Sequence, residues 1–187
     1  MASMKFITIW LLAGVLHQNP PSPPEFKASS NPTSDAVRQQ LASQSKNLVD
    51  SAELLPADKY GYQPTPAQMT FGKLVAHIAQ TNLALCSAIS GAPSPLPPDE
   101  LKKLSDATAK DALLAAIKRS FDYCTEGLAK VTDSQLGDEV SMFGRRTGMA
   151  RAAAMIVLVA DWADHYSTAA SYLRLNGILP PTAQPKK

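Results

Sequence analysis

The sequence predicts an all-α fold, a four-helix bundle within a chain of 187 residues. In four long segments, apolar residues recur every three or four positions, the spacing that puts them on one face of a helix. No segment shows the alternation of apolar and polar residues that is typical of a half-buried strand. Residues that cap or end helices stand between the segments. Four amphipathic helices of this length are expected to bury their apolar faces against one another.

Residues 1–17 are expected to be a signal peptide. Lys5 precedes an apolar run at residues 6–16, which is too short to span a bilayer and is typical of the hydrophobic region of a signal peptide. No A-x-A pattern marks a cleavage site, so a core helix or an uncleaved membrane tether is the alternative. The main expectation is a mature protein without a transmembrane span, exported to the periplasm or the extracellular space.

The remaining chain divides into a spacer, a folded domain and a tail. Residues 18–33 are rich in Pro and Ser, which is typical of a disordered spacer. The helical domain is expected over residues 34–181, followed by a flexible tail over 182–187. The first helix should begin with Thr33 or Ser34 as its N-cap and end before Pro56.

The second and third helices are predicted to run parallel. The second begins after the N-cap Thr70 and ends at Gly91, and the third runs from about Lys110 to Val131. The Pro-rich linker between them contains a short helical segment at residues 99–104. Because an extended chain covers about 3.3 Å per residue, this linker can travel the length of a helix. The sequence therefore favours a long crossover between these helices over a hairpin.

The fourth helix is predicted over residues 147–176. Its first half is rich in small and apolar residues, as in a central core helix, and Asn176-Gly177 is a favourable C-cap before two prolines. Arg145 and Arg146 stand just before it. They are interpreted as a solvated turn, with binding of an anionic group near the mouth of a site as the alternative.

Composition excludes several classes of function. The net charge is +2, the pI is about 8.5, and aromatic residues make up 6% of the chain. The charge is too small for a surface that binds phosphates, and the aromatic residues are too few for a surface on which bases stack. No nucleic-acid partner is therefore expected. Phosphate-binding glycine loops, the nucleophile-elbow motif and H-E-x-x-H are missing from the sequence, and no nucleotide cofactor is expected.

His77 and His165 are the candidate site histidines, because the third histidine, His17, falls in the expected signal peptide. Asp161 and His165 are four residues apart, so they project from one helix face about one turn apart. Together with His77 they form a His/His/Asp donor set, which suits zinc, nickel, iron(II) or manganese with positions open for water or substrate. A buried hydrogen-bonded cluster without metal explains the same pattern equally well.

Cys86 and Cys124 lie on the second and third predicted helices. In an exported protein they would meet an oxidising compartment. A disulfide between parallel neighbouring helices and a pair of buried thiols are both open, because sequence cannot supply the distance between the two residues.

Three runs of the chain resemble the DinB-like four-helix bundle superfamily: KYGYQPTPAQMTFGKLVAHIAQTN, SFDYCTEGLAKVTDSQL and DHYSTAASYLRLNGILPP. The resemblance implies an up-down-down-up bundle, which agrees with the expected crossover. Many members of that family carry a metal site of three histidines. His77 and His165 match its first and third positions, whereas Asp161 occupies the middle position and departs from the pattern.

The resemblance also implies a class of activity, since characterised relatives include metal-dependent thiol S-transferases and other small-molecule enzymes. The chain is therefore expected to be a metal-dependent transferase or hydrolase acting on an unidentified small molecule. The alternative is a non-catalytic bundle with a degenerate metal site, which binds a small ligand or serves a structural or stress role. Assembly as a homodimer is left open.

Overall fold

The computed structural model describes residues 28–104, 109–142 and 145–185, and most of them are helical. Short 3₁₀ turns occupy Ala57–Lys59, Asp133–Gln135 and Pro181–Ala183. The all-α prediction is confirmed, with a small antiparallel hairpin added to it. The helices are α1 (Pro32–Leu54), α2 (Phe71–Ser90), α3 (Pro98–Leu104), α4 (Lys110–Leu128) and α5 (Arg151–Leu175), and the hairpin strands are β1 (Glu139–Met142) and β2 (Arg145–Ala150).

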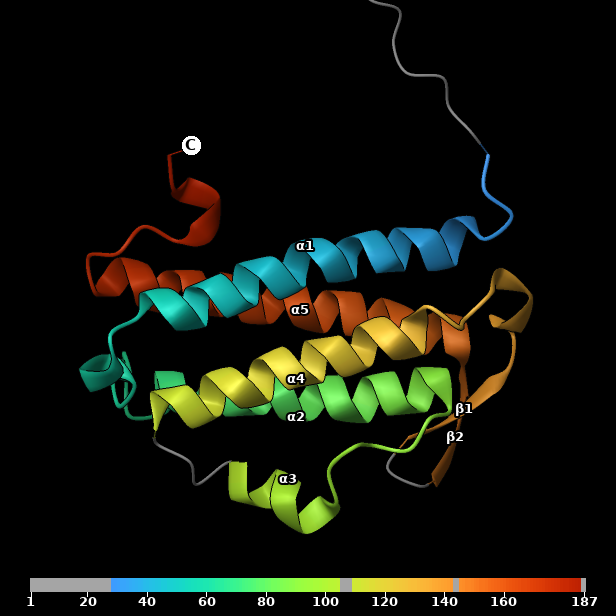
Figure 1. Ribbon diagram of the computed structural model, residues 1–187, viewed down its shortest axis with the longest axis horizontal. Coiled ribbons are helices and arrows are strands. Elements are labelled where there is room, and N and C mark those ends of the chain that lie inside the picture. The colour runs from blue at the N-terminus through green and yellow to red at the C-terminus, as the bar shows by residue number, and fades with distance from the viewer. Residues whose placement is uncertain (1–27, 105–108, 143–144, 186–187) are drawn as a thin grey trace, which may run out of the picture.

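The four long helices form a bundle with up-down-down-up topology (Figure 1). Helices α2 and α4 lie side by side and run in the same direction, while α1 and α5 run in the opposite direction. Helix α1 packs on α4 and α5, and α2 packs on both of them as well. The short helix α3 lies in the connection between α2 and α4, so the predicted crossover is confirmed.

The predicted ends of α2 are also confirmed. The Thr70 hydroxyl accepts a hydrogen bond of 3.2 Å from the Lys73 amide, as an N-cap residue does. At the other end, Gly91 adopts a φ of 73°, the left-handed conformation that ends helices. These caps place the beginning and end of α2 independently of the rest of the bundle.

The hairpin corrects the prediction for the start of the last helix. Residues 147–150 were expected to be helical and no strand was expected, but β2 runs to Ala150 and α5 begins at Arg151. Gly148 has a φ of 66°, which interrupts any right-handed helix there. Opposite it, the β1–β2 register shifts between Val140 and Ser141. Pairing with β1 therefore outweighs the helix-like composition of this segment.

A buried chain of polar side chains connects three helices within the mostly apolar core. The indole Nε1 of Trp162 in α5 donates to Asn82 Oδ1 in α2 over 2.7 Å, and Asn82 Nδ2 donates to the Ser120 hydroxyl in α4 over 2.9 Å. All three residues are fully buried. Each polar group thus has a partner, as burial requires, and the chain fixes how the three helices meet.

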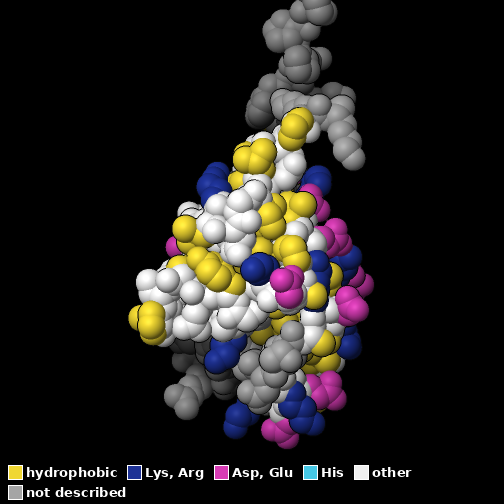
Figure 2. Space-filling model, turned by 90° about the vertical axis from the view of Figure 1, so that its left-hand side faces the viewer, with side chains coloured by type: hydrophobic (Ala, Val, Ile, Leu, Met, Phe, Trp, Pro, Cys, Tyr) yellow, Lys and Arg dark blue, Asp and Glu magenta, His cyan; other side chains and the backbone are white. Residues whose placement is uncertain are grey.

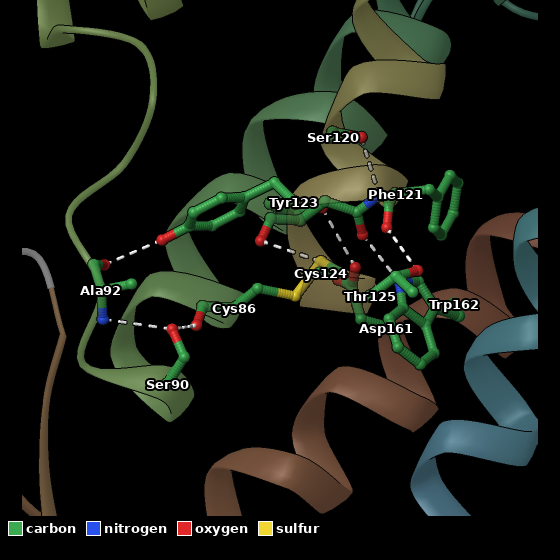
Figure 3. The surroundings of a disulfide bond; sticks show 12 residues. Cys86, Ser90, Ala92, Ser120, Phe121, Tyr123, Cys124, Thr125, Asp161 and Trp162 are labelled. Carbon is green, nitrogen blue, oxygen red and sulfur yellow. Dashed lines mark hydrogen bonds between the residues drawn. A yellow bond between two sulfur atoms is a disulfide. The ribbon is translucent and has the colours of Figure 1, made fainter. Parts of the chain in front are cut away.

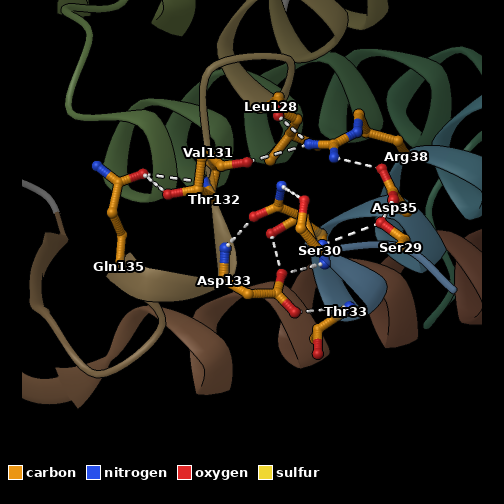
Figure 4. Close-up of polar contacts among 12 residues, drawn as sticks. Ser29, Ser30, Thr33, Asp35, Arg38, Leu128, Val131, Thr132, Asp133 and Gln135 are labelled. Carbon is orange, nitrogen blue, oxygen red and sulfur yellow. Dashed lines mark hydrogen bonds and ion pairs between the residues drawn. The ribbon is translucent and has the colours of Figure 1, made fainter.

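The N-terminus of α1 is held by a carboxylate from the turn after α4. Asp133 accepts hydrogen bonds from the backbone amides of Thr33 and Ser34, at 2.9 and 2.8 Å, and from the Ser34 hydroxyl at 2.7 Å (Figure 4). Asn31 Oδ1 in turn accepts from the Asp133 amide over 2.9 Å. The residues directly before α1 therefore contact the bundle. The predicted signal peptide and most of the predicted spacer lie outside the described residues.

Acidic and basic side chains are interspersed over the bundle end shown in Figure 2, without a large patch of one sign. This agrees with the small net charge of +2. Among the described helices, none combines the length and the apolarity that crossing a membrane requires.

Candidate functional site

His77 of α2 and His165 of α5 meet across the interface between these helices. Their ring centroids are 5.0 Å apart and the ring planes are inclined by 47°. His165 is buried and His77 is half-buried. Each histidine lies on the face of its helix that is turned toward the other helix. The apolar stripes of α2 and α5 predict this face.

Asp161 orients the His165 ring from one turn earlier on α5. The Nδ1 atom of His165 lies 2.6 Å from the Asp161 backbone carbonyl, which can only accept a hydrogen bond, so Nδ1 carries the proton. The Asp161 carboxylate lies on the same side of the ring, with Oδ2 at 3.4 Å from Nδ1. The other ring nitrogen, Nε2, is thereby left as the acceptor, the form in which an imidazole binds a metal.

Thr81 of α2 holds the Asp161 carboxylate from the opposite helix. Its hydroxyl lies 3.1 Å from Asp161 Oδ2 and 3.2 Å from the carbonyl of Ile78 in its own helix. The Asp161 side chain is 20% exposed, so this carboxylate is only partly solvated. Asp161 therefore lies between a hydroxyl and an imidazole, and both bonds keep it against the α2–α5 interface.

The two histidines have opposite electrostatic environments. Burial lowers the pKa of His77, and the nearby His165 ring lowers it further against the opposing charge of Asp161. Burial would also lower the pKa of His165, but hydrogen bonds from its ring to Asp161 and the charges of Asp161 and Asp164 raise it overall. His77 is consequently the ring that favours the neutral form, and His165 is the ring that accepts a proton more readily.

The spacing of the two rings fits a shared divalent ion. Two imidazoles at about 2.1 Å from one ion, at roughly a tetrahedral angle, have centroids about 5 Å apart, close to the 5.0 Å between His77 and His165. No described residue donates or accepts a hydrogen bond at the His77 ring. However, the described part of the chain contains no group of three or more His, Cys, Asp or Glu residues arranged to hold a metal. Two imidazole ligands therefore fit a divalent ion by their spacing. Asp161 lies on the Nδ1 side of His165, and not beside Nε2.

An open pocket of about 440 Å³ lies against both histidines. Asp161 does not line it, whereas Asp164, one turn further along α5, does. A depression of about 520 Å³ between α1 and the C-terminal segment contains no histidine or cysteine, so its lining offers no imidazole or thiol. The histidine pocket is lined by Gln68, Met69, Leu74, His77, Asp164, His165, Thr168 and Tyr172.

Cys86 of α2 and Cys124 of α4 form a disulfide, with their Cα atoms 5.2 Å apart (Figure 3). Both residues are fully buried. The bond crosses between the two parallel helices near Trp162 and Asp161 of α5 (Figure 3). It lies about two turns of α2 beyond His77, so it stabilises the helix pair that carries the site without lining the pocket.

Sequence reasoning missed several residues around the site. Thr81 and Asn82 are polar residues within the apolar stripe of α2, and Asn82 is fully buried. A polar residue at a core position is a signal that a partner must exist, because burial without a hydrogen bond is costly. The sequence does not say which partner, and here the partners, Asp161 and Trp162, come from α5.

Arg145 and Arg146 do not lie beside the histidine pocket. Their backbones belong to β2, which leads into α5 at the end of the bundle where α2 finishes. Arg151, the first residue of α5, donates to the carbonyl of Ile89 near the end of α2. The hairpin backbone is thus two or more helical turns away from His77.

Comparisons with known proteins identify the same fold. A family model described as the DinB superfamily matches residues 40–169. A DinB-like protein from Bacillus subtilis superposes with a TM-score of 0.62 at 22% identity, over 81% of this chain and 99% of that one. A DinB-like protein from Bacillus cereus superposes with a TM-score of 0.60 at 16% identity, over 79% and 95%.

A mycothiol-dependent maleylpyruvate isomerase is also similar, with a TM-score of 0.57 at 17% identity. The match covers 72% of this chain but only 59% of the isomerase. At these identities the structural likeness shows the fold alone. The comparison with curated proteins found no match.

Proposed function

The chain belongs to the DinB superfamily, and on that premise we propose that it is a metal-dependent enzyme acting on a small molecule, as a transferase or a hydrolase. His77 and His165 supply the imidazole ligands, and the Asp161 carboxylate belongs to the same cluster. The observation that carries the proposal is the pair of rings at 5.0 Å against an open pocket. Binding of a divalent metal and catalysis of a reaction are both parts of this proposal.

The protein groups have separate tasks in such a site. Asp161 keeps the proton of His165 on Nδ1, so that Nε2 points its lone pair away from the carboxylate. Thr81 keeps Asp161 from rotating away from the ring. A divalent ion, when bound, lowers the pKa of a coordinated water or thiol and so provides a nucleophile near neutral pH. The pocket beside the rings leaves space for the molecule that this nucleophile would attack.

The test is the metal content and metal affinity of protein purified without a histidine tag. We expect one divalent ion per chain in the wild-type protein, and loss of calorimetric binding in His77→Ala and His165→Ala. Asp122→Asn is the control, because Asp122 is an exposed carboxylate of α4 outside the histidine cluster and this variant should bind like the wild type. Equal binding by wild type and both site variants would overturn the proposal.

A second candidate is a non-catalytic bundle that binds a small ligand. It is supported by the lack of a three-residue metal cluster among the described residues. In that case the bonds from Asp161 to His165 and Thr81 are a structural network at the pocket floor. Metal-free wild type that has the same melting temperature before and after addition of zinc, nickel, iron(II) or manganese would favour this candidate, because a ligand that binds the native state stabilises it.

We also propose that the protein is exported by its N-terminal segment. The Cys86–Cys124 disulfide supports this proposal, since such bonds persist mainly in oxidising compartments. Cell fractionation of the full-length protein tests it, with a Lys5→Glu variant to weaken the positive start of the signal. Equal amounts of both proteins in the cytosol, with free thiols, would contradict export.

A further inference from the structure

The histidine pocket continues into a second pocket along the C-terminal half of α5. This second pocket has a volume of about 350 Å³. The two pockets share Gln68, Thr168 and Tyr172, so they adjoin and form one groove that starts at the histidines. We call this combined space the α5 groove. Its outer part is lined by Pro64, Gln68, Ser167, Thr168, Ser171, Tyr172 and Leu175.

The α5 groove has one charged lining group apart from the histidines, the carboxylate of Asp164. No Lys or Arg appears among the described residues that line it. The closest basic residue on α2 is Lys73, one turn before His77, and it is exposed outside the lining. In the metal-free protein the groove therefore presents negative charge, which disfavours anionic ligands and favours cations.

Two hydroxyl groups of the wall, those of Ser171 and Tyr172, donate to backbone carbonyls of the protein. The Tyr172 hydroxyl donates to the Met69 carbonyl over 2.6 Å, and the Ser171 hydroxyl donates to the Ser167 carbonyl over 2.9 Å. Each hydroxyl has a single hydrogen, so these two oxygens can only accept a hydrogen bond from a ligand. Gln68 Oε1 is already bonded to the Thr65 hydroxyl at 3.0 Å, which leaves the Gln68 amide and the hydroxyls of Ser167 and Thr168 as neutral donors.

From charge and donor direction together, we propose that the α5 groove binds an organic amine in its protonated form. An ammonium group has three donors and a positive charge, which suits Asp164 and the acceptor oxygens of Ser171 and Tyr172. The apolar chain of such a ligand would lie along Leu175 and Pro64. This inference rests on the proposed function in one respect, since the groove begins at the proposed metal ligands and the amine would be the substrate.

Three linear four-carbon probes separate the candidate chemistries: 1,4-diaminobutane, 1,4-butanediol and succinate. They are titrated into metal-free protein at about pH 8, where free histidine is neutral and both amines are charged. The readout is the NMR shift of the backbone amides of Gln68, Thr168 and Tyr172. We expect the diamine to bind at least about threefold more tightly than the diol, as a surface ion pair allows, and succinate not to bind.

Asp164→Asn should remove the preference for the diamine over the diol. Asp122→Asn is the matched control, because Asp122 is an exposed carboxylate of α4 that does not line the groove. Binding of succinate as tight as that of the diamine would overturn the inference. The same holds if no probe shifts these amides, or if Asp164→Asn keeps the preference. Because the protein is metal-free, diamine binding by a protein that takes up no metal would refute the proposed function and leave the groove assignment intact.

Discussion

Asp161 occupies the middle position of the three-histidine pattern that the family resemblance implies. The orientation of its carboxylate is constrained, because Thr81 and His165 contact it from two sides. Under the proposed function, a carboxylate beside a metal-binding imidazole would reduce the positive charge around the ion and favour harder metals such as manganese. The identity of residue 161 is therefore expected to set metal preference more than the fold does.

Asp161→His removes the negative charge beside His165 and the hydrogen bond from Thr81, so that an imidazole at 161 is free to turn toward the site as a third ligand. In that orientation it should shift metal selectivity toward zinc or nickel over manganese, since these ions favour imidazole ligands. Loss of the Thr81 hydrogen bond should lower the free energy of unfolding by only about 1 kcal/mol. Calorimetric titration of wild type and variant with each ion, at matched pH, measures the shift. If neither protein binds any ion more tightly than a His77→Ala, His165→Ala double variant, the cluster is structural and the family likeness extends to the fold only.

Asp133→Asn should destabilise the protein at neutral pH, and the effect should disappear in acid. Desolvation raises the pKa of Asp133, but hydrogen bonds from Ser34 and Thr33 outweigh it and hold the pKa at about 2, below the ordinary 3.8. A carboxylate whose pKa is lower in the folded state stabilises the protein at any pH above its unfolded-state pKa. This stabilisation is lost as the pH falls from about 4 to about 2. Thermal melts across this range test it, with Asp122→Asn as the control. A constant difference in melting temperature down to about pH 2 would contradict the linkage.

The position of the two histidines could be predicted from sequence, because helix phase alone decides which face of α2 and α5 they occupy. The direction of the Asp161 carboxylate could not. It depends on Thr81, a residue eighty positions earlier in the chain, and no local pattern connects the two. The same is true of Asp164, whose place in the pocket lining follows from the way that α5 packs on α2.

Some boundaries of the helices and strands are set by local residues, and others are set by contacts with distant parts of the chain. Thr70 and Gly91 end α2 through their own side chain and backbone, so the sequence predicts both ends correctly. The hairpin before α5 depends on pairing between two strands, each with an unremarkable composition. The small residues of this segment favour a helix in the sequence, whereas the turn at Gly148 depends on pairing with the strand opposite.

Gly148→Ala should lower the free energy of unfolding by about 1 kcal/mol, the cost of a left-handed conformation for a residue with a Cβ. An added Cβ at Gly148 meets no atom within 4 Å, so the expected loss is due to the backbone alone. Gly61→Ala is the control, because that site is equally open but has no positive φ. Urea unfolding measures both. Equal midpoints for the two variants would show that the turn at Gly148 relaxes without cost.

Removing the disulfide should weaken the α2–α4 pair. Cys86 and Cys124 are 38 residues apart, and closing a loop of this size stabilises a native state by about 4 kcal/mol. The double variant Cys86→Ala, Cys124→Ala should therefore unfold at a lower urea concentration than the oxidised wild type. Fully reduced wild type should unfold close to the double variant. Indistinguishable midpoints for oxidised and reduced wild type would refute a stabilising role for the bond.

At the scale of the whole molecule, the segment before Ser29 is expected to be dispensable for folding. A chain that begins at Ser29 keeps the bond between Asn31 and the Asp133 amide and should melt cooperatively, like the full-length protein. A chain that begins at Pro32 loses that bond and should melt at a lower temperature. Circular dichroism of the two shortened proteins tests this difference. Loss of cooperative melting in the longer one would show that residues before Ser29 pack on the bundle.

The parallel arrangement of α2 and α4 has a consequence for the rate of folding. These two helices make the most extensive contact in the bundle, yet the whole crossover with α3 separates them in sequence. Neighbouring helices in a hairpin meet after closing a short loop, whereas α2 and α4 must first close a long one, which costs entropy before any contact forms. The protein should fold more slowly than an up-down-up-down bundle of the same size. Refolding with the Cys86–Cys124 bond intact should be faster than refolding of the reduced chain, because the bond has already closed that loop.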